Sequence, residues 1–211
     1  PSSASLAQWF DAAAITPLVD SYGVMPFAFH GAWCTQSGHN TPLYGPSSQQ
    51  DHPGSVHDTV RYWTESRGVP PSKILMGLAF FGISFDSEDL YRPFTETGRA
   101  DYSSIRSLIG HGYTRRWDST CNVPYLTQDY GPILWSYDDP QSIDLKCQYV
   151  IENDLGGVAI WDVTMDLVDG RQELLETVGS KLMSTPTEPR MSITAVQNRI
   201  TIQLPRSATN K

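Results

Sequence analysis

Residues 155–166 read LGGVAIWDVTMD, and this stretch decides the fold of the chain. Two glycines lead into a short apolar run that ends at Trp161 and is followed by acidic and hydroxyl residues. Short apolar runs between turn residues are typical of parallel strands that are buried on both faces. The pattern predicts a buried strand whose last side chains reach a functional site, as at the carboxyl ends of barrel strands. The alternative for Trp161 is core packing alone.

Helical and extended patterns alternate along most of the chain. Ser55 starts an apolar helical face that ends at Gly68, and Asp139 with Pro140 has the cap and first-turn proline of another helix. We expect helices over residues 5–19, 55–67, 140–155 and 172–183, and buried strands over residues 24–29, 74–81 and 157–162. This alternation predicts a parallel sheet built from strand–helix units.

Three regions interrupt the alternation. Residues 30–50 are rich in Gly, Pro, Ser, Thr and Asn, which predicts a long loop at the rim of the sheet. Residues 83–134 are polar and too long for a loop, so we expect a small subdomain of short strands and a helix. After residue 184 a Thr- and Pro-containing linker leads to residues 193–204, whose alternation predicts the start of a separate small β module.

The composition excludes several classes of protein. The net charge is −8 and no basic cluster extends beyond Arg115 and Arg116, so nucleic-acid binding is not expected. No apolar run has the length of a membrane span, and residues 1–4 lack the basic and apolar parts of a signal peptide. The high aromatic content suits sugar binding and equally suits a packed core.

The cysteines and histidines show no metal-site spacing. Three cysteines cannot form a disulfide framework, but one bridge stays open, with Cys121 and Cys147 as the favoured pair. The five histidines are expected at the surface or in turns. We expect neither a metal ion nor a cofactor.

Six motifs follow one another along the chain: residues 27–33 (FAFHGAW), 38–44 (GHNTPLY), 76–82 (MGLAFFG), 123–125 (VPY), 136–140 (SYDDP) and 156–161 (GGVAIW). In order and spacing they resemble the second half of the family 18 glycoside hydrolase chitinases, over about residues 1–185. The resemblance implies a (β/α)8 TIM barrel with an α+β insertion after the seventh strand. It also implies retaining, substrate-assisted cleavage: a glutamic acid protonates the glycosidic oxygen, and the acetamido oxygen of the substrate attacks the anomeric carbon.

The expected fold class is therefore α/β, a partial (β/α)8 TIM barrel whose sixth, seventh and eighth strands are residues 24–29, 74–81 and 157–162. An α+β chitinase insertion subdomain accompanies it. The expected segments are residues 1–85, the barrel from its fifth helix to its seventh strand; 86–135, the insertion; 136–185, the barrel from its seventh helix to its eighth; and 186–211, a linker and the start of a β module.

The catalytic acid of the family lies in the pattern Asp-x-x-Asp-x-Asp-x-Glu after the fourth strand, and the chain does not contain this pattern. The acidic residues 86–89 have neither its spacing nor its position. Without the insertion and the tail about 130 residues remain, whereas eight strand–helix units need roughly 200–250. We expect no catalytic residue in this chain, and the missing N-terminal half of the barrel is an expected partner.

Three positions at which family members carry polar groups are apolar here. The resemblance assigns a tyrosine and an aspartate to Phe27 and Ala28, and a tyrosine to Phe81, where they contact the acetamido group. Loss of one such group typically costs a few kcal/mol of transition-state stabilisation. Severe loss of chitin hydrolysis is therefore expected, even with a glutamate supplied elsewhere. Core packing is the expected role of Phe27 and Phe81.

The resemblance retains aromatic groups for binding. It makes Trp161 the floor on which a sugar stacks, Trp33 an extension of the aromatic track and Asn122 a polar sugar contact. For Trp33 and Asn122, packing or simple exposure is equally open. The expected substrate-binding residues are Trp161, Trp33, Phe27, Ala28, Phe81, Met25 and Asn122.

Three functions are compatible with these residues. The first is part of a chitinase or chitinase-like protein that acts on or binds chitin or N-acetylglucosamine oligosaccharides and is inactive alone. The second is a lectin-like barrel that binds without cutting, and the third is a glycosidase of altered specificity whose acid lies in the missing half. A glutamate at the end of the fourth strand favours the enzymes, while glutamine or leucine there favours the lectin.

The C-terminal residues provide a prediction of where the protein is located. Residues 196–202 resemble the opening of the C-terminal β modules that bacteria of the Bacteroidetes type use for secretion sorting. This resemblance implies a secreted or cell-surface protein. A generic β-sandwich start is the alternative.

Overall fold

Three parallel strands form one side of the five-stranded first sheet. In the computed structural model, which describes residues 7–46, 53–183, 193–196 and 199–203, they are β1 (Tyr22–Val24), β2 (Ile74–Ala79) and β8 (Gly157–Trp161). β2 pairs in parallel with both neighbours, and Ala79 lies opposite Trp161. All six residues of β2 are buried. The predicted buried parallel sheet is confirmed.

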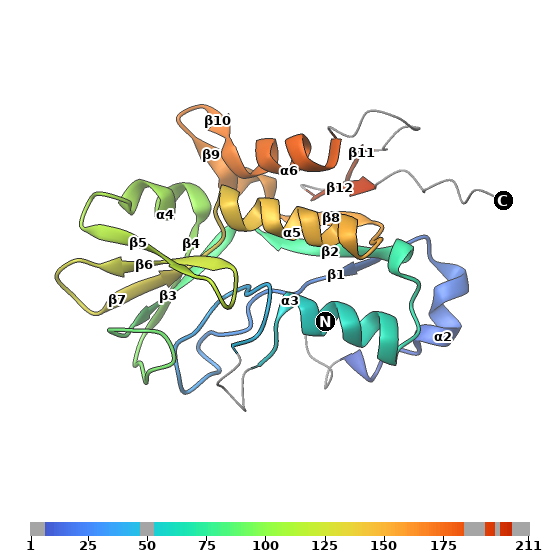
Figure 1. The fold of residues 1–211 in the computed structure, drawn as a ribbon, viewed down its shortest axis with the longest axis horizontal. Coiled ribbons are helices and arrows are strands. Elements are labelled where there is room, and N and C mark those ends of the chain that lie inside the picture. Colours follow the sequence, from blue (N-terminus) through green and yellow to red (C-terminus); the bar gives the residue numbers. More distant parts are fainter. Residues whose placement is uncertain (1–6, 47–52, 184–192, 197–198, 204–211) are drawn as a thin grey trace.

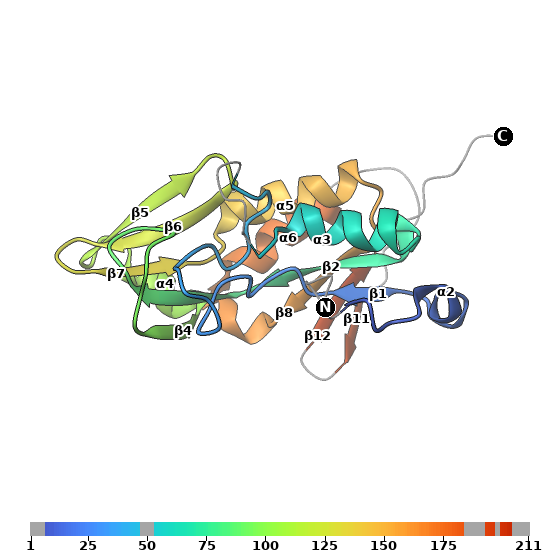
Figure 2. The same cartoon turned by 90° about the horizontal axis from the view of Figure 1, so that it is seen from below.

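Helices cover one face of this sheet (Figures 1 and 2). They are α3 (Val56–Arg61), which continues into the π-helical turn Tyr62–Ser66, α5 (Pro140–Glu152) and α6 (Glu173–Met183). The predicted helix starts are confirmed: Ser55 caps α3, and Asp139 forms a capping box with Ser142 ahead of Pro140. α5 packs against α6. None of the described helices is both long and apolar enough to cross a membrane.

Two predicted elements near the N-terminus are shorter in the structure. The strand expected over residues 24–29 is wrong beyond Val24, where β1 ends. Pro26 cannot donate a ladder hydrogen bond, and Ala28 has a left-handed backbone with φ of 57°. The helix expected over residues 5–19 is reduced to α2 (Ala12–Ile15) and the 3-10 turn Thr16–Leu18, and residues 1–6 lie outside the described part.

A second, antiparallel sheet follows β2. Its strand order is β4-β3-β7-β6-β5, and it starts at Phe81 rather than at residue 86. Its elements are β3 (Phe81–Asp86), β4 (Thr97–Asp101), α4 (Tyr102–Leu108), β5 (Tyr113–Asp118), β6 (Val123–Gln128) and β7 (Ile133–Ser136). The single strand expected over residues 74–81 is therefore two elements, because β2 ends at Ala79 and β3 leaves the first sheet. The sheet forms one lobe of the molecule in Figure 2.

The C-terminal strands belong to the first sheet. β11 (Ile193–Val196) and β12 (Arg199–Gln203) form an antiparallel hairpin, and β12 pairs with β8. The described part of the tail thus extends the first sheet, because the backbone groups on the second edge of β8 bond to β12, and the separate β module stays a prediction. The expected linker, from residue 184 to 192, lies outside the described residues. The remaining short elements are η3 (Pro71–Lys73), η4 (Val163–Asp166), β9 (Leu167–Val168) and β10 (Arg171–Gln172).

All three cysteines are free. The suggested bridge between Cys121 and Cys147 is therefore wrong. Both side chains are buried, Cys121 just before β6 and Cys147 on the buried face of α5. They act as small apolar core residues.

Candidate functional site

A cavity of about 500 Å³ opens at the carboxyl end of β8, beside Trp161. We call it the Trp161 cavity; it is lined by Met25, Phe27, Ala28, Gly31, Ala32, Trp33, Phe81, Ile83, Thr97, Gly98, Arg99 and Trp161. Six of the seven predicted binding residues are in this set. The residues that line the cavity come from the loop after β1 and the strands β3, β4 and β8, so the two sheets meet here. The seventh, Asn122, does not line the cavity; it is a half-buried turn residue with φ of 52°.

Aromatic rings form the inner part of the cavity. Trp161 is half-buried, so part of its surface faces the opening while the rest packs against buried apolar residues. Phe81 is buried, and its ring meets that of Phe27 edge to face at 5.6 Å between centroids. This packing agrees with the core role expected for the two phenylalanines.

Trp33 stands at the rim, with 66% of its surface exposed. Its indole ring lies over Gly31, where a Cβ atom would come within 2.5 Å of the ring. A glycine is therefore required for this ring position. Met25, also on the rim, is 47% exposed. An exposed tryptophan and methionine beside a half-buried tryptophan form an apolar surface of the kind that binding sites present.

A buried amide holds the cavity walls together, and sequence reasoning missed it. The side chain of Asn40 accepts a hydrogen bond from the Ala28 backbone at 3.0 Å and donates one to the Phe81 carbonyl, also at 3.0 Å. Its backbone N–H donates to Ser136 Oγ at 2.7 Å. Asn40 belongs to the motif GHNTPLY, but no spacing within that motif indicates a bridge to residues more than 40 positions away.

Arg99 is the charged residue of the Trp161 cavity. Among the described lining residues it alone carries a charge, and none is a carboxylate. Its guanidinium lies 3.9 Å from the centre of the Phe81 ring, in a cation–π contact. The cavity can therefore bind a ligand by stacking and by charge, and it contributes no acid–base pair of its own.

A second, larger cavity of about 720 Å³ lies between α4, α5 and α6. Three arginines line it, and each pairs with a carboxylate: Arg106 with Glu173, Arg115 with Asp139 and Arg171 with Glu176. Its charges are matched within the wall, and none of the predicted binding residues is present. We therefore build the site on the Trp161 cavity.

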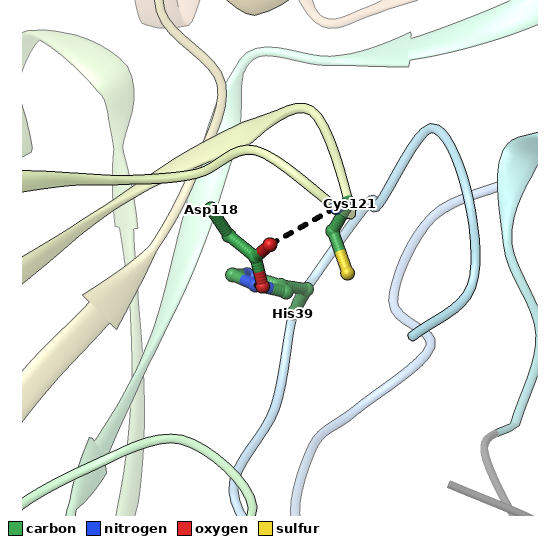
Figure 3. A group of neighbouring side chains, drawn as sticks. All are labelled: His39, Asp118 and Cys121. Carbon is green, nitrogen blue, oxygen red and sulfur yellow. Dashed lines mark hydrogen bonds and ion pairs between the residues drawn. The ribbon is translucent and has the colours of Figure 1, made fainter. Parts of the chain in front are cut away.

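One group of described residues has the chemistry of metal ligands: His39, Asp118 and Cys121, with their ligand atoms within 4.8 Å of one another (Figure 3). The surface location expected for the histidines is wrong for His39, which is fully buried, and for His30, which is 5% exposed. His39 Nε2 lies 3.1 Å from Asp118 Oδ2. The backbone N–H of Cys121 donates to Asp118 Oδ1 at 3.0 Å.

Hydrogen bonds join the three residues of this group into an anchor. The hydrogen bond from His39 holds the pKa of Asp118 well below its usual range. Burial raises the pKa of the Cys121 thiol to about 12, so the thiol is protonated at neutral pH in this hydrogen-bonded arrangement. The anchor ties the rim loop, through His39, to the end of β5 in the second sheet.

Asp118→Asn is expected to lower the free energy of unfolding by about 1–2 kcal/mol at pH 7, because a charge-assisted hydrogen bond is lost. The pKa of Asp118 is lower in the folded than in the unfolded protein, so its stabilisation is complete above the unfolded pKa and declines as the pH falls. The difference between wild type and variant should therefore shrink from pH 7 to pH 3 in urea titrations. Asp20→Asn, at an exposed carboxylate, is the control. An equal difference at both pH values would contradict the charge-assisted hydrogen bond of Asp118.

Comparison with known proteins supplies the family context of this site. The family described as glycosyl hydrolases family 18 matches residues 1–166. A probable endochitinase of Caenorhabditis elegans is 30% identical over 179 residues, which cover 77% of this chain and 28% of that protein. The chain thus spans less than a third of the length of this relative.

Two solved structures resemble the fold. The group IV chitinase of Ostrinia furnacalis, in complex with allosamidin, is 29% identical with a TM-score of 0.74, covering 82% of this chain and 52% of that one. Human YKL-39, described as a pseudo-chitinase with retained chitooligosaccharide binding properties, is 26% identical with a TM-score of 0.75, covering 82% and 53%. The chain spans about half of each of these solved chains.

Proposed function

Because the chain belongs to family 18 of the glycosyl hydrolases, we propose that it binds oligosaccharides of N-acetylglucosamine, the units of chitin, in the Trp161 cavity. One observation carries the proposal: six predicted binding residues from three separate segments line the same cavity, with Trp161 half-buried on its wall. Sugar rings present C–H groups on their faces, and these pack well on aromatic rings. The relatives support the same ligand, since human YKL-39 is described as binding chitooligosaccharides.

We also propose that β1, β2 and β8 are the sixth, seventh and eighth strands of a (β/α)8 barrel. Their parallel pairing in this order supports the assignment. The antiparallel sheet from Phe81 to Ser136 would be the insertion, so that its borders replace the residues 86 and 135 expected from the sequence. The N-terminal half of such a barrel is then the proposed partner, and its strands would have to pair with β1 at one edge and take the place of β12 beside β8 at the other.

The proposed action of this chain is binding without hydrolysis. The lining contains no carboxylate among the described residues, and the sequence lacks the pattern Asp-x-x-Asp-x-Asp-x-Glu. Phe27, Ala28 and Phe81 offer no side-chain polar group to an acetamido substituent. A lectin-like protein is favoured by these replacements. A glycosidase whose acid comes from the other half of a barrel is the second candidate, favoured by the chitinases among the relatives.

Because chitin is an extracellular polymer, we propose a secreted or cell-surface location.

Calorimetric titration of the intact chain with chitotetraose tests the proposal, with cellotetraose as the sugar that lacks acetamido groups. Chitotetraose should bind, and Trp33→Ala should lower its affinity about 3- to 10-fold, since up to about 1.4 kcal/mol of rim contact is lost. Trp9→Ala is the matched control, because Trp9 is 82% exposed and does not line the cavity. Absence of chitotetraose binding, or an equal effect of the two substitutions, would overturn the proposal.

A further inference from the structure

Arg99 is one of the described arginines that form no ion pair, and among these it is the one that lines the Trp161 cavity. Four other arginines, Arg61, Arg106, Arg115 and Arg171, form ion pairs with carboxylates. Within the described residues no carboxylate forms a salt bridge with Arg99, although its side chain is exposed on β4 and lines the Trp161 cavity. The charge at the wall of the cavity is therefore not neutralised by the protein.

The Phe81 ring positions this charge. The guanidinium carbon of Arg99 lies 3.9 Å from the ring centre, so the cation rests on the ring face. A guanidinium presents its N–H donors in a planar fork that matches the two oxygens of a carboxylate. Stacking on a buried ring limits the side-chain motion and leaves those donors for a ligand.

The rest of the lining has no group that would oppose an anion. Met25, Phe27, Trp33 and Trp161 are apolar, and no acidic residue lines the cavity among those described. Apolar walls lower the effective dielectric constant, which strengthens a charge pair formed there. The net charge of the chain is −8, but at physiological salt charges beyond about 8 Å are largely screened. The local guanidinium therefore decides the sign of the preferred ligand.

We propose that the Trp161 cavity prefers an acidic oligosaccharide in which a sugar carboxylate neighbours N-acetylglucosamine, and that Arg99 binds this carboxylate. The inference rests on the proposed function, because it needs a saccharide stacked on Trp161. Neutral chitin fragments lack the anion. Deacetylated fragments carry ammonium groups and meet an unfavourable cation.

The test compares three tetrasaccharides by calorimetry at 0.15 M salt and pH 7: a hyaluronan tetrasaccharide, which alternates N-acetylglucosamine with glucuronic acid, chitotetraose and tetraglucosamine. Hyaluronan should bind about 3- to 10-fold more tightly than chitotetraose, and tetraglucosamine most weakly, because the Arg99 guanidinium attracts a carboxylate and repels an ammonium group. Arg99→Gln should abolish the preference for hyaluronan over chitotetraose, and Arg99→Lys should retain part of it. Arg92→Gln, an exposed arginine outside the cavity, should leave the preference unchanged.

The outcomes separate the two proposals. Chitotetraose binding with no preference for hyaluronan, or a preference that survives in Arg99→Gln, overturns the role of Arg99 and leaves the proposed function standing. Tighter binding of tetraglucosamine than of chitotetraose also overturns it. Failure of all three sugars to bind overturns the proposed function and this inference together. Circular dichroism and thermal unfolding of each variant identify any loss of folding.

Discussion

Lys146→Met is expected to lower the free energy of unfolding by about 3–5 kcal/mol, because it leaves a buried carboxylate without its counter-charge. Lys146 Nζ lies 2.6 and 2.7 Å from the two carboxylate oxygens of Asp138. It also donates to the carbonyl and hydroxyl oxygens of Thr41 at 2.6 and 2.9 Å. Both charged side chains are fully buried. The lysine thus joins α5 to the loop that carries Asn40, and through it to the Trp161 cavity.

Lys146 and Asp138 each stay charged only while the other is present. Burial raises the pKa of Asp138 and lowers the pKa of Lys146, so the two charges persist through their mutual contact. In the double variant with Asp138→Asn, which removes the orphaned carboxyl group, part of the lost stability should return.

Urea unfolding monitored by tryptophan fluorescence measures these differences. Lys181→Met is the matched control, since Lys181 pairs with Asp144 at 3.1 Å but both side chains are partly exposed. Such a pair is worth about 0–1 kcal/mol. Equal costs for Lys146→Met and Lys181→Met would show that the buried pair does not hold the loop.

Trp161→Ala is expected to weaken chitotetraose binding at least about 30-fold, which corresponds to about 2 kcal/mol. Trp161 is the last residue of β8 and pairs with Ala79 of β2, and this pairing holds its ring at the wall of the cavity. The half-buried ring contributes a rigid apolar face, so its removal takes away the contact area and leaves a hollow that the sugar cannot fill. Trp161→Phe, which keeps a smaller aromatic face, should lie between wild type and Trp161→Ala.

Calorimetry is the suitable measurement, because the substitution itself changes the tryptophan fluorescence. Thermal unfolding of Trp161→Ala verifies that the fold survives. Wild-type affinity in a folded Trp161→Ala would remove this ring from the binding site and contradict the proposed stacking.

Local signals predicted most of the regular structure. Ser55 and Asp139 cap helices in the structure as their positions next to apolar faces indicated, and the glycine-led run before Trp161 is a parallel strand. These features depend on residues within about one turn or one strand of each other. The extended pattern at residues 25–29 gave a wrong prediction, because β1 ends at Val24. The extended pattern in the tail was predicted correctly, but its pairing partner β8 was not, since a local pattern carries no information about the strand next to it.

The sequence by itself determined the family, the helix starts, the parallel strands and the residues that gather around Trp161, because motifs and periodicity are written in neighbouring positions. Only the tertiary structure decided the roles of Asn40, Arg99, Lys146 and the pair of His39 with Asp118. Asn40, Lys146 and His39 act on partners about 40 to 105 positions away along the chain, and Arg99 stacks on a ring of the neighbouring strand. Burial and pairing of a polar side chain depend on what the fold brings next to it, and a linear pattern carries no record of that neighbour.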